Sequence, residues 1–170
     1  MNLYEILLNF DFLISKILFL PSPYSIYFAL FTETTFFFYL LFAYILIKRK
    51  SSRWKKMFFY AFFGYLVVFL LKIIFNRPRP YEELQVFSTI QKFEKSFPSS
   101  HAFLSALLIN FVPNENWKKY FIFYTILVSI SLIISGVHYL SDVLVGALLG
   151  FIFPRYILPE KKLENIKILK

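Results

Sequence analysis

Cysteine is absent from this sequence and histidine is scarce, with two residues in 170. Without cysteine there is no disulfide, no thiolate nucleophile and no cysteine-ligated metal. Two histidines among scattered carboxylates do not make a two-metal catalytic site, so we expect no metal centre. Strand-type alternation, internal repeats and low-complexity segments are also missing, which leaves an all-helical chain.

Hydrophobic residues are abundant instead. They make up 58% of the chain, with 24 Phe and 12 Tyr, against roughly 45–50% in a soluble domain. A single soluble domain of this size cannot bury so many aromatic side chains. The apolar residues also come in long blocks, which is typical of lipid-exposed helices. The net charge of +9 is therefore expected to sort to one side of a membrane, and we expect no nucleic-acid partner.

The apolar residues form six segments, at about Leu3–Leu20, Tyr24–Ile47, Met57–Phe75, Ser100–Val112, Trp117–Ser135 and Ser141–Leu158. A hydrocarbon core about 30 Å thick needs roughly 20 helical residues, so the third and fifth segments fit well and the second fits with tilt. The fourth is short unless its polar start enters the membrane, and the first either spans or lies in the interface. We predict an all-α polytopic membrane protein, a six-helix bundle forming a single domain over residues 1–170.

The basic residues orient this bundle. If all six segments cross, loops 48–56 and 113–119 and the carboxyl-terminal tail share one side, with Lys48, Arg49, Lys50, Arg53, Lys55, Lys56, Lys118, Lys119, Arg155, Lys161, Lys162, Lys167 and Lys170. The other side holds Lys72, Arg77, Arg79, Lys92 and Lys95. The positive-inside rule then places both termini in the cytoplasm. The histidine-bearing loops would face the periplasm from a bacterial inner membrane.

Two short motifs on that outer side carry polar chemistry. Lys72 and Arg79 lie about two helical turns apart, so they either face one point or act as separate interfacial anchors. In the stretch "PSSH", Ser99 or Ser100 is a good helix N-cap. His101 is then an incidental first-turn residue, or else part of an anion site at the helix start.

The third motif, "SGVHYLSDVLVG", places His138 four residues before Asp142. A carboxylate at this spacing can accept from one imidazole nitrogen and leave the other nucleophilic, although a capping Asp near a histidine is also common. Together with His101 and the outer-side cations, the pair completes a phosphoryl-transfer set. One histidine would attack the phosphorus and the other would protonate the leaving oxygen.

The order of these motifs resembles the type 2 phosphatidic acid phosphatase superfamily, which contains membrane lipid phosphatases and soluble haloperoxidase-like relatives. The matching stretches are Lys72-x6-Arg79-Pro80, Pro98-Ser99-Ser100-His101 and Ser131-x6-His138-x3-Asp142. The resemblance implies that His138 forms a phosphohistidine, that Asp142 orients it and that His101 is the general acid. It further implies that no metal or other cofactor is needed, and that the phosphoryl oxygens are held by Lys72, Arg79 and the amides around Ser99 and Ser100.

Two positions depart from the family pattern. Ser100 stands where the family usually has Gly, and small residues are commonly accepted there. Leu132 stands where the family has an Arg that contacts the phosphate, and leucine cannot replace a bidentate cation. Three explanations stay open: Arg77 supplies the missing charge, the protein is a weakened or inactive member, or Leu132 is a deliberate substitution or an error in the sequence.

The substrate class follows from the small size and short outer loops, which leave no separate domain to recognise a large soluble headgroup. We therefore expect an amphiphilic lipid phosphate that enters sideways from the bilayer. The resemblance favours a lipid A 1-phosphatase, with a phosphatidylglycerophosphate or undecaprenyl pyrophosphate phosphatase as alternatives. A non-catalytic lipid-binding or transport protein with a degenerate pocket is the alternative from another class, favoured by Leu132 and opposed by the intact histidines.

Overall fold

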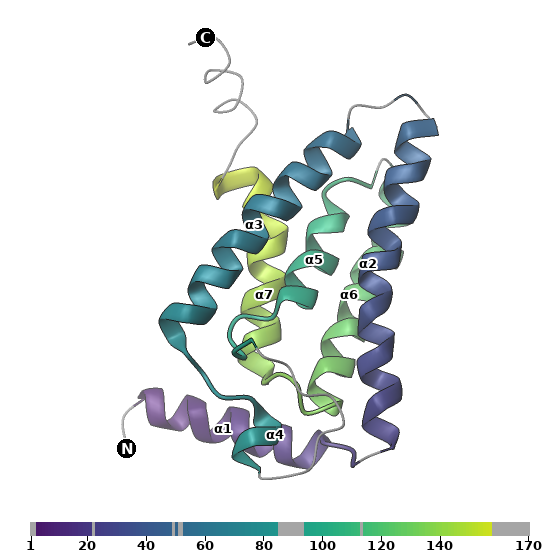
Figure 1. The fold of residues 1–170 in the computed structure, drawn as a ribbon. Helices are drawn as coiled ribbons and strands as arrows, with labels where there is room; N and C mark the ends of the chain where they lie inside the picture. The colour runs from purple at the N-terminus through teal and green to yellow at the C-terminus, as the bar shows by residue number, and fades with distance from the viewer. Residues whose placement is uncertain are drawn as a thin grey trace.

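A computed structural model describes residues 3–21, 23–48, 50, 53–84, 94–112 and 114–157 of the chain. The regular elements formed by these residues are all helices, which confirms the predicted fold class (Figure 1). The elements are α1 (Leu3–Leu18), α2 (Tyr24–Lys48), α3 (Arg53–Phe75), α4 (Pro80–Glu83), α5 (Ser100–Ile109), α6 (Glu115–Ile134) and α7 (Leu140–Ile152), followed by a π-helical turn at Phe153–Ile157. Each predicted apolar segment is a helix whose ends differ from the expected ones by a few residues.

Helix α5 lies at the centre of the bundle and is short for that reason. Most of its side chains are buried, including Ala102, Phe103, Ser105, Ala106, Leu107, Leu108 and Ile109. Because α2, α3, α6 and α7 pack around it, α5 does not need the length of a lipid-facing helix. The fourth segment is therefore short because it is enclosed by protein.

Two glycines bring α7 into direct contact with α5. A β-carbon at Gly146 would lie 2.5 Å from the carbonyl oxygen of Ser99, and one at Gly150 would lie 2.1 Å from that of Phe103. Their four-residue spacing places both on one face of α7, as in other close helix pairs in membranes. The start of α5 and the first turns of α7 are thus fixed against each other, backbone to backbone.

The outer surfaces of α2, α3 and α6 are apolar. Large exposed side chains there include Phe36, Phe37, Phe62, Leu70, Ile74, Phe123 and Ile130. Within the described residues, three helices have the length and hydropathy needed to cross a membrane, and they lie in α2, in the segment that contains α3, and in α6. The chain is therefore a multi-pass membrane protein.

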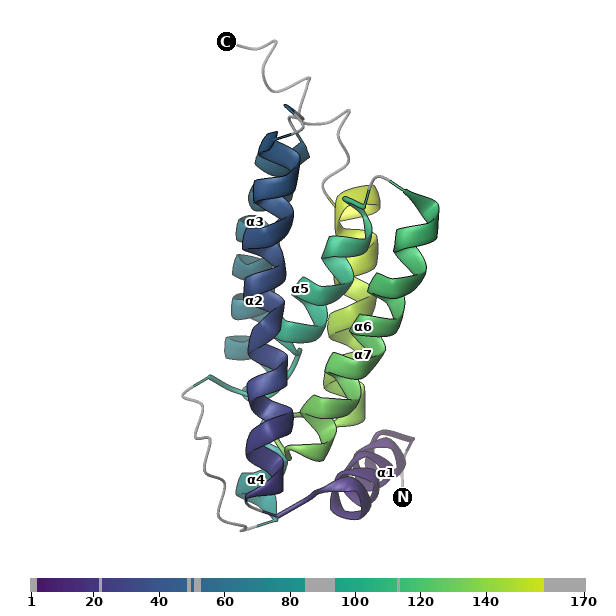
Figure 2. The same ribbon diagram turned by 90° about the vertical axis from the view of Figure 1, so that its right-hand side faces the viewer.

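Helix α1 does not run along the other helices but lies crosswise at one end of the bundle (Figures 1 and 2). Its buried face carries Asp11 and Ser15, whereas apolar residues such as Leu7, Phe10 and Ile17 are exposed. An apolar helix that is polar on its inner face suits the membrane interface, the second of the two predicted options. Helix α1 and the π-helical turn after α7 lie at opposite ends of the bundle (Figure 1), an arrangement that does not favour the prediction that both termini lie on one side.

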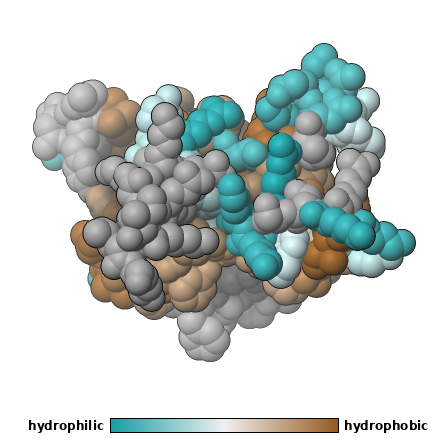
Figure 3. Space-filling model, turned by 90° about the horizontal axis from the view of Figure 1, so that it is seen from above, coloured by the Kyte–Doolittle hydropathy of each residue, from teal (hydrophilic) through white to brown (hydrophobic). Residues whose placement is uncertain are grey.

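Basic residues gather at the end of the bundle opposite α1. Figure 3 looks onto this end, where hydrophilic residues stand out against the apolar flanks. The described basic residues there are Lys48, Lys50, Arg53, Lys55, Lys56, Lys118, Lys119 and Arg155. The charge asymmetry predicted for the loops after α2 and before α6 is thus present in the folded chain.

Candidate active site

Residues from four separate segments line one cavity at the α1 end of the bundle. Lys72 comes from the last turn of α3, Arg79 from the loop before α4, Ser100 and His101 from the start of α5, and His138 from the loop between α6 and α7. The cavity has a volume of about 490 Å³. The three sequence motifs, which run from Lys72 to Asp142, therefore meet in one place.

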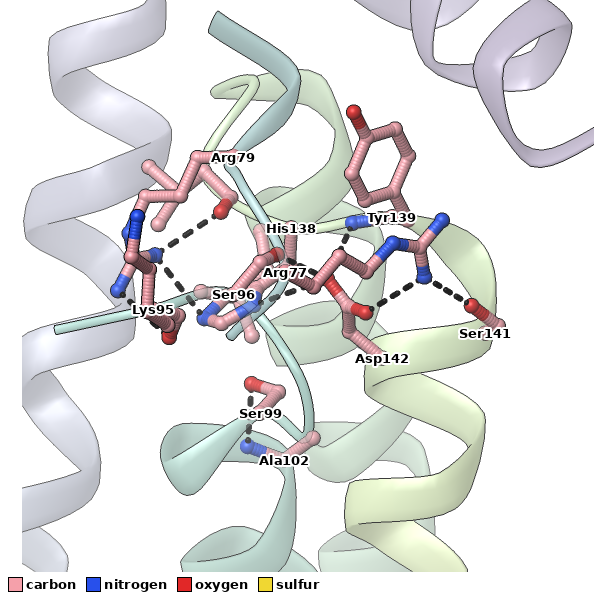
Figure 4. A network of polar contacts seen from close by, with 12 residues as sticks. Arg77, Arg79, Lys95, Ser96, Ser99, Ala102, His138, Tyr139, Ser141 and Asp142 are labelled. Carbon is pink, nitrogen blue, oxygen red and sulfur yellow. Dashed lines mark hydrogen bonds and ion pairs between the residues drawn. The ribbon is translucent and has the colours of Figure 1, made fainter. Parts of the chain in front are cut away.

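His138 is buried and its two ring nitrogens have different neighbours (Figure 4). Nδ1 lies 3.4 Å from Oδ2 of Asp142, and Nε2 lies 3.5 Å from Nη1 of Arg79. Because a guanidinium can only donate, Nε2 carries the lone pair and the proton lies on Nδ1, toward Asp142. Burial lowers the pKa of His138 from its ordinary 6.5 to about 3. The imidazole is thus neutral, with its free nitrogen beside a cation.

Asp142 is fully buried and has a donor on each side. Its Oδ2 accepts from the Ser96 hydroxyl and, at 2.9 Å, from the backbone N–H of Tyr139, while Oδ1 accepts from Nη1 of Arg77 at 2.9 Å. The bond to Tyr139 caps the first turn of α7, so the same carboxylate starts the helix and orients His138. A buried carboxylate with several donors stays ionised, as this orienting role requires.

Lys72 and Arg79 are buried at the cavity and are held by backbone carbonyls. Lys72 Nζ donates to the carbonyl oxygen of Lys95 at 2.6 Å. Arg79 donates through Nε to the carbonyl of Glu94 at 2.8 Å and through Nη1 to that of Val137 at 2.9 Å. These carbonyl contacts fix both cations in place, and Lys72 Nζ also lies 3.9 Å from Oε2 of Glu94. The prediction that the two residues face one point agrees with this geometry.

The two serines of the second motif have different surroundings. Ser99 is the N-cap of α5, with its hydroxyl accepting from the N–H of Ala102 at 3.4 Å and its own N–H donating to the carbonyl of Asp142 at 3.0 Å. The Ser99 N–H is therefore not available to bind a phosphoryl oxygen. Ser100 lines the cavity, and its buried hydroxyl has no hydrogen-bond partner among the described residues. An unpaired buried hydroxyl is costly, and an oxygen of a bound ligand would satisfy it.

His101 has an acidic neighbour that sequence reasoning did not identify. Its Nε2 lies 3.4 Å from Oε1 of Glu33, which comes from α2 and also lines the cavity. A carboxylate inside an otherwise apolar spanning segment is a functional signal in membrane proteins, and the sequence "TETT" at 32–35 carried it. The contact places a carboxylate of α2 beside the His101 ring at the cavity.

The positions of Arg77 and Leu132 bear on whether Arg77 supplies the charge of the arginine that the family has at position 132. Arg77 binds Asp142, Ser141 and Asp11 on the far side of His138 from Arg79 (Figure 4), and it is not among the residues that line the cavity. Its position therefore does not favour the explanation that it supplies the missing charge. Leu132 itself lines the cavity, with 1% of its surface exposed. The side chain of an Arg at this position would extend from the wall into the cavity.

A buried His–Asp pair, a second histidine and two fixed cations around one cavity are the side chains that phosphoryl transfer by a protein requires. The sequence profile of the PAP2 superfamily matches residues 53–159, which include all three motifs. The chain belongs to the PAP2 superfamily, and membership in this family of phosphatases implies hydrolysis of phosphate esters. No curated protein sequence matches the chain.

Two solved structures share the fold. LpxE of Aquifex aeolicus is 25% identical, with a TM-score of 0.68 over 85% of this chain and 90% of that chain. The first transmembrane PAP2-type phosphatidylglycerolphosphate phosphatase from Bacillus subtilis is 23% identical, with a TM-score of 0.72 over 97% of this chain and 90% of that chain. The second likeness extends the shared architecture to α1 and α2, which lie outside the match to the family profile.

Proposed function

We propose that the protein removes a phosphate from an amphiphilic lipid phosphate through a phosphohistidine on His138. The observation that carries the proposal is the state of that histidine. It is neutral, its Nδ1 proton lies toward Asp142, and its Nε2 faces a cavity that Lys72 and Arg79 also line. Such an imidazole is a competent nucleophile, and two buried cations stabilise the charge of a transferring phosphoryl group.

In the first step, Nε2 of His138 attacks the phosphorus atom and the bond from phosphorus to the lipid oxygen breaks. The lone pair of Nε2 forms the new N–P bond, and the imidazole becomes cationic because Nδ1 keeps its proton. The Asp142 carboxylate, 3.4 Å from Nδ1, stabilises that charge. His101 donates its proton to the departing lipid oxygen, and Glu33, 3.4 Å from its Nε2, positions the ring.

In the second step, water attacks the phosphohistidine and inorganic phosphate leaves. His101, now neutral, accepts a proton from the attacking water, and the N–P bond electrons return to Nε2 of His138. Through both steps Lys72, Arg79 and the unpaired hydroxyl of Ser100 hold the phosphoryl oxygens. Ser99 acts indirectly, by capping α5 and binding the backbone of Asp142.

The shape of the cavity supports a substrate with lipid chains. Its wall includes Phe36 of α2 and Tyr65 of α3, and both side chains are also exposed on the apolar flank of the bundle. The cavity thus reaches the surface that faces lipid, between α2 and α3. An amphiphile can place its phosphate on the cations while its chains stay in the bilayer.

Lipid A 1-phosphate is the substrate we favour within this class, because the compact chain resembles bacterial phosphatases of that kind. Phosphatidylglycerophosphate and undecaprenyl pyrophosphate are the alternatives, and the B. subtilis structure is that of a phosphatidylglycerolphosphate phosphatase. We place the protein in a bacterial inner membrane. By the positive-inside rule, the basic end faces the cytoplasm and the cavity faces the periplasm.

The test is phosphate release by the purified full-length protein in phospholipid vesicles that contain one of the three lipids. We expect release from at least one lipid, with a different kcat/KM for each. His138→Ala should abolish release, because the covalent intermediate cannot form, and Asp142→Asn should leave a small residual rate. Turnover by His138→Ala close to that of the unaltered protein contradicts the mechanism.

A second candidate function rests on Leu132, which removes a cation that the family uses. A lipid-binding or transport protein that keeps a phosphatase-like pocket would bind the same lipids without releasing phosphate. Saturable lipid binding with no phosphate release, and no trapped phosphoenzyme, would support this candidate. The contact of His138 Nδ1 with the Asp142 carboxylate at 3.4 Å is the observation against it.

A further inference from the structure

Helix α1 reaches the catalytic region through one side chain. The Asp11 carboxylate accepts from the backbone N–H of Ser141 at 3.0 Å through Oδ1. Its Oδ2 accepts from the Ser141 hydroxyl and, at 3.1 Å, from Nη2 of Arg77. Asp11 is buried although it belongs to a helix whose other side chains are largely exposed. Burying this carboxylate costs desolvation energy, and the hydrogen bonds and the ion pair that Asp11 makes offset that cost.

Arg77 connects this carboxylate to the catalytic one. Its Nη1 donates to Oδ1 of Asp142 at 2.9 Å and to the hydroxyl of Ser141 at 2.7 Å. Its guanidinium carbon lies 3.9 Å from the ring centre of Tyr139, which fixes the plane of the group by stacking. One planar cation thus lies between two buried carboxylates, with one nitrogen directed to each.

We infer that Asp11 is a positioning residue for His138, acting through Arg77 and Asp142. The inference rests on the proposed function. Asp142 Oδ2 faces His138, Ser96 and the Tyr139 amide, and Oδ1 accepts from Arg77. Arg77 therefore sets the rotation of the carboxylate about its Cβ–Cγ bond, and Asp11 sets the position of Arg77 from its other side. Without Asp11, the guanidinium loses one of its two anionic anchors, and the plane of the Asp142 carboxylate is less restricted.

Asp11 is the member of this arrangement that lies outside the family match. Asp11 precedes the match to the PAP2 profile, which begins at residue 53, and Arg77 is not one of the residues that line the cavity. Two further contacts hold α1 in place: Leu20 N–H donates to the carbonyl of Ile134 at 3.0 Å, and Phe19 packs on Gly136. Helix α1 is therefore seated on the loop that carries His138.

The experiment compares Asp11→Asn with Glu5→Gln, which removes the same charge from an exposed position of the same helix. Each full-length variant is placed in vesicles containing a lipid phosphate that the unaltered protein hydrolyses, and active sites are counted by trapping the phosphoenzyme. We expect Asp11→Asn to lower kcat per active site about 10-fold, with KM almost unchanged, as for other residues that orient a catalytic group from behind. Glu5→Gln should keep the starting kcat.

A double variant tests the route of the effect. If Asp11 acts through Asp142, then Asp11→Asn should have little further effect on kcat in the Asp142→Asn background. Two separate full effects that multiply would contradict that route. Arg77→Lys provides a second test if Asp11→Asn does not fold, because a single ammonium cannot reach both carboxylates as the guanidinium does. Arg77→Lys with an undiminished kcat overturns the inference.

Failure of the inference and failure of the proposed function give different results. Folded Asp11→Asn with the starting kcat per active site overturns the positioning role and leaves the phosphatase function intact. If the unaltered protein hydrolyses none of the lipids, the proposed function fails, and the Tm values of the same single and double variants still test the connection. Additive Tm changes for Asp11→Asn and Asp142→Asn would then show that the two carboxylates are not coupled.

Discussion

Leu132→Arg is the substitution that most directly tests how the phosphoryl group is held. The new guanidinium would start from the cavity wall, where Leu132 now packs against Ala102, Val128 and Val143. In the empty cavity it would meet the cations Lys72 and Arg79, and also the carboxylates of two other lining residues, Glu33 and Glu94. The local charge is therefore mixed, and the arginine has anionic neighbours before substrate binds.

Leu132→Arg should have two opposing effects, a loss of folding stability and a gain in kcat. Replacing a buried leucine costs about 2–5 kcal/mol when the side chain is truncated, and the aliphatic stem of arginine keeps this near the lower value. A loss of about 2 kcal/mol lowers the Tm of a protein of this size by about 4–8 °C. On the rate, a preorganised donor to a developing anion is worth about 10²–10³ in kcat. We therefore expect Leu132→Arg to be less stable than the starting protein and faster by about that factor.

The assay measures kcat per trapped phosphoenzyme in vesicles, together with the Tm. Leu132→Met is the matched control, because it keeps the apolar volume and adds no charge. The gain should fall mainly on kcat, since the arginine contacts the phosphoryl group most strongly in the transition state. A folded Leu132→Arg that is no faster than Leu132→Met would refute the reasoning and show that Lys72 and Arg79 already suffice.

Three further predictions concern metal, acid and leaving group. Phosphate release should persist in EDTA, since side-chain cations provide the electrostatic stabilisation, and complete loss that Mg²⁺ restores would contradict this. Because burial lowers the pKa of His138 to about 3 while an unfolded histidine takes its proton near 6.5, the unfolded state binds more protons between these values. Stability should fall by up to about 1.4 kcal/mol per pH unit as pH drops through this window. The Tm of His138→Gln should fall less over the same window, and an equal fall in both proteins would argue against the buried neutral imidazole. Finally, His101→Ala and Glu33→Gln should slow release from a lipid alkoxide far more than from p-nitrophenyl phosphate, whose leaving group needs no proton. Equal losses on both substrates would remove His101 from the acid role.

The sequence was sufficient for the elements and for the residues with recognisable spacing. Apolar blocks predicted the helices to within a few residues, because lipid exposure requires long uninterrupted runs. Lys72, Arg79 and His138 were predicted to meet, and they line one cavity. This worked because these side chains stand at the order and spacing of the family's sequence motifs, which is visible without the fold.

What the sequence could not predict are contacts between segments far apart in the chain. Asp11 looked like an interruption of an apolar segment, and its partners Arg77 and Ser141 lie more than 60 residues away. The same holds for Glu33 and His101, which belong to different helices. Arg77 was considered as a phosphate ligand because its charge is visible in the sequence. The Arg77 side chain points toward the carboxylates of Asp11 and Asp142, and only the folded chain brings these two carboxylates together.

The close contact of α5 and α7 has a consequence for reading genetic variation in this protein. Both histidines depend on that contact, since His101 lies in the first turn of α5 and His138 just precedes α7. A methyl group at Gly146 or Gly150 would push the two backbones apart and separate the acid from the nucleophile. Neither glycine lines the cavity. In a screen for loss of activity, substitutions at these two glycines would nevertheless be as damaging as substitutions at the histidines, although neither glycine takes part in the chemistry.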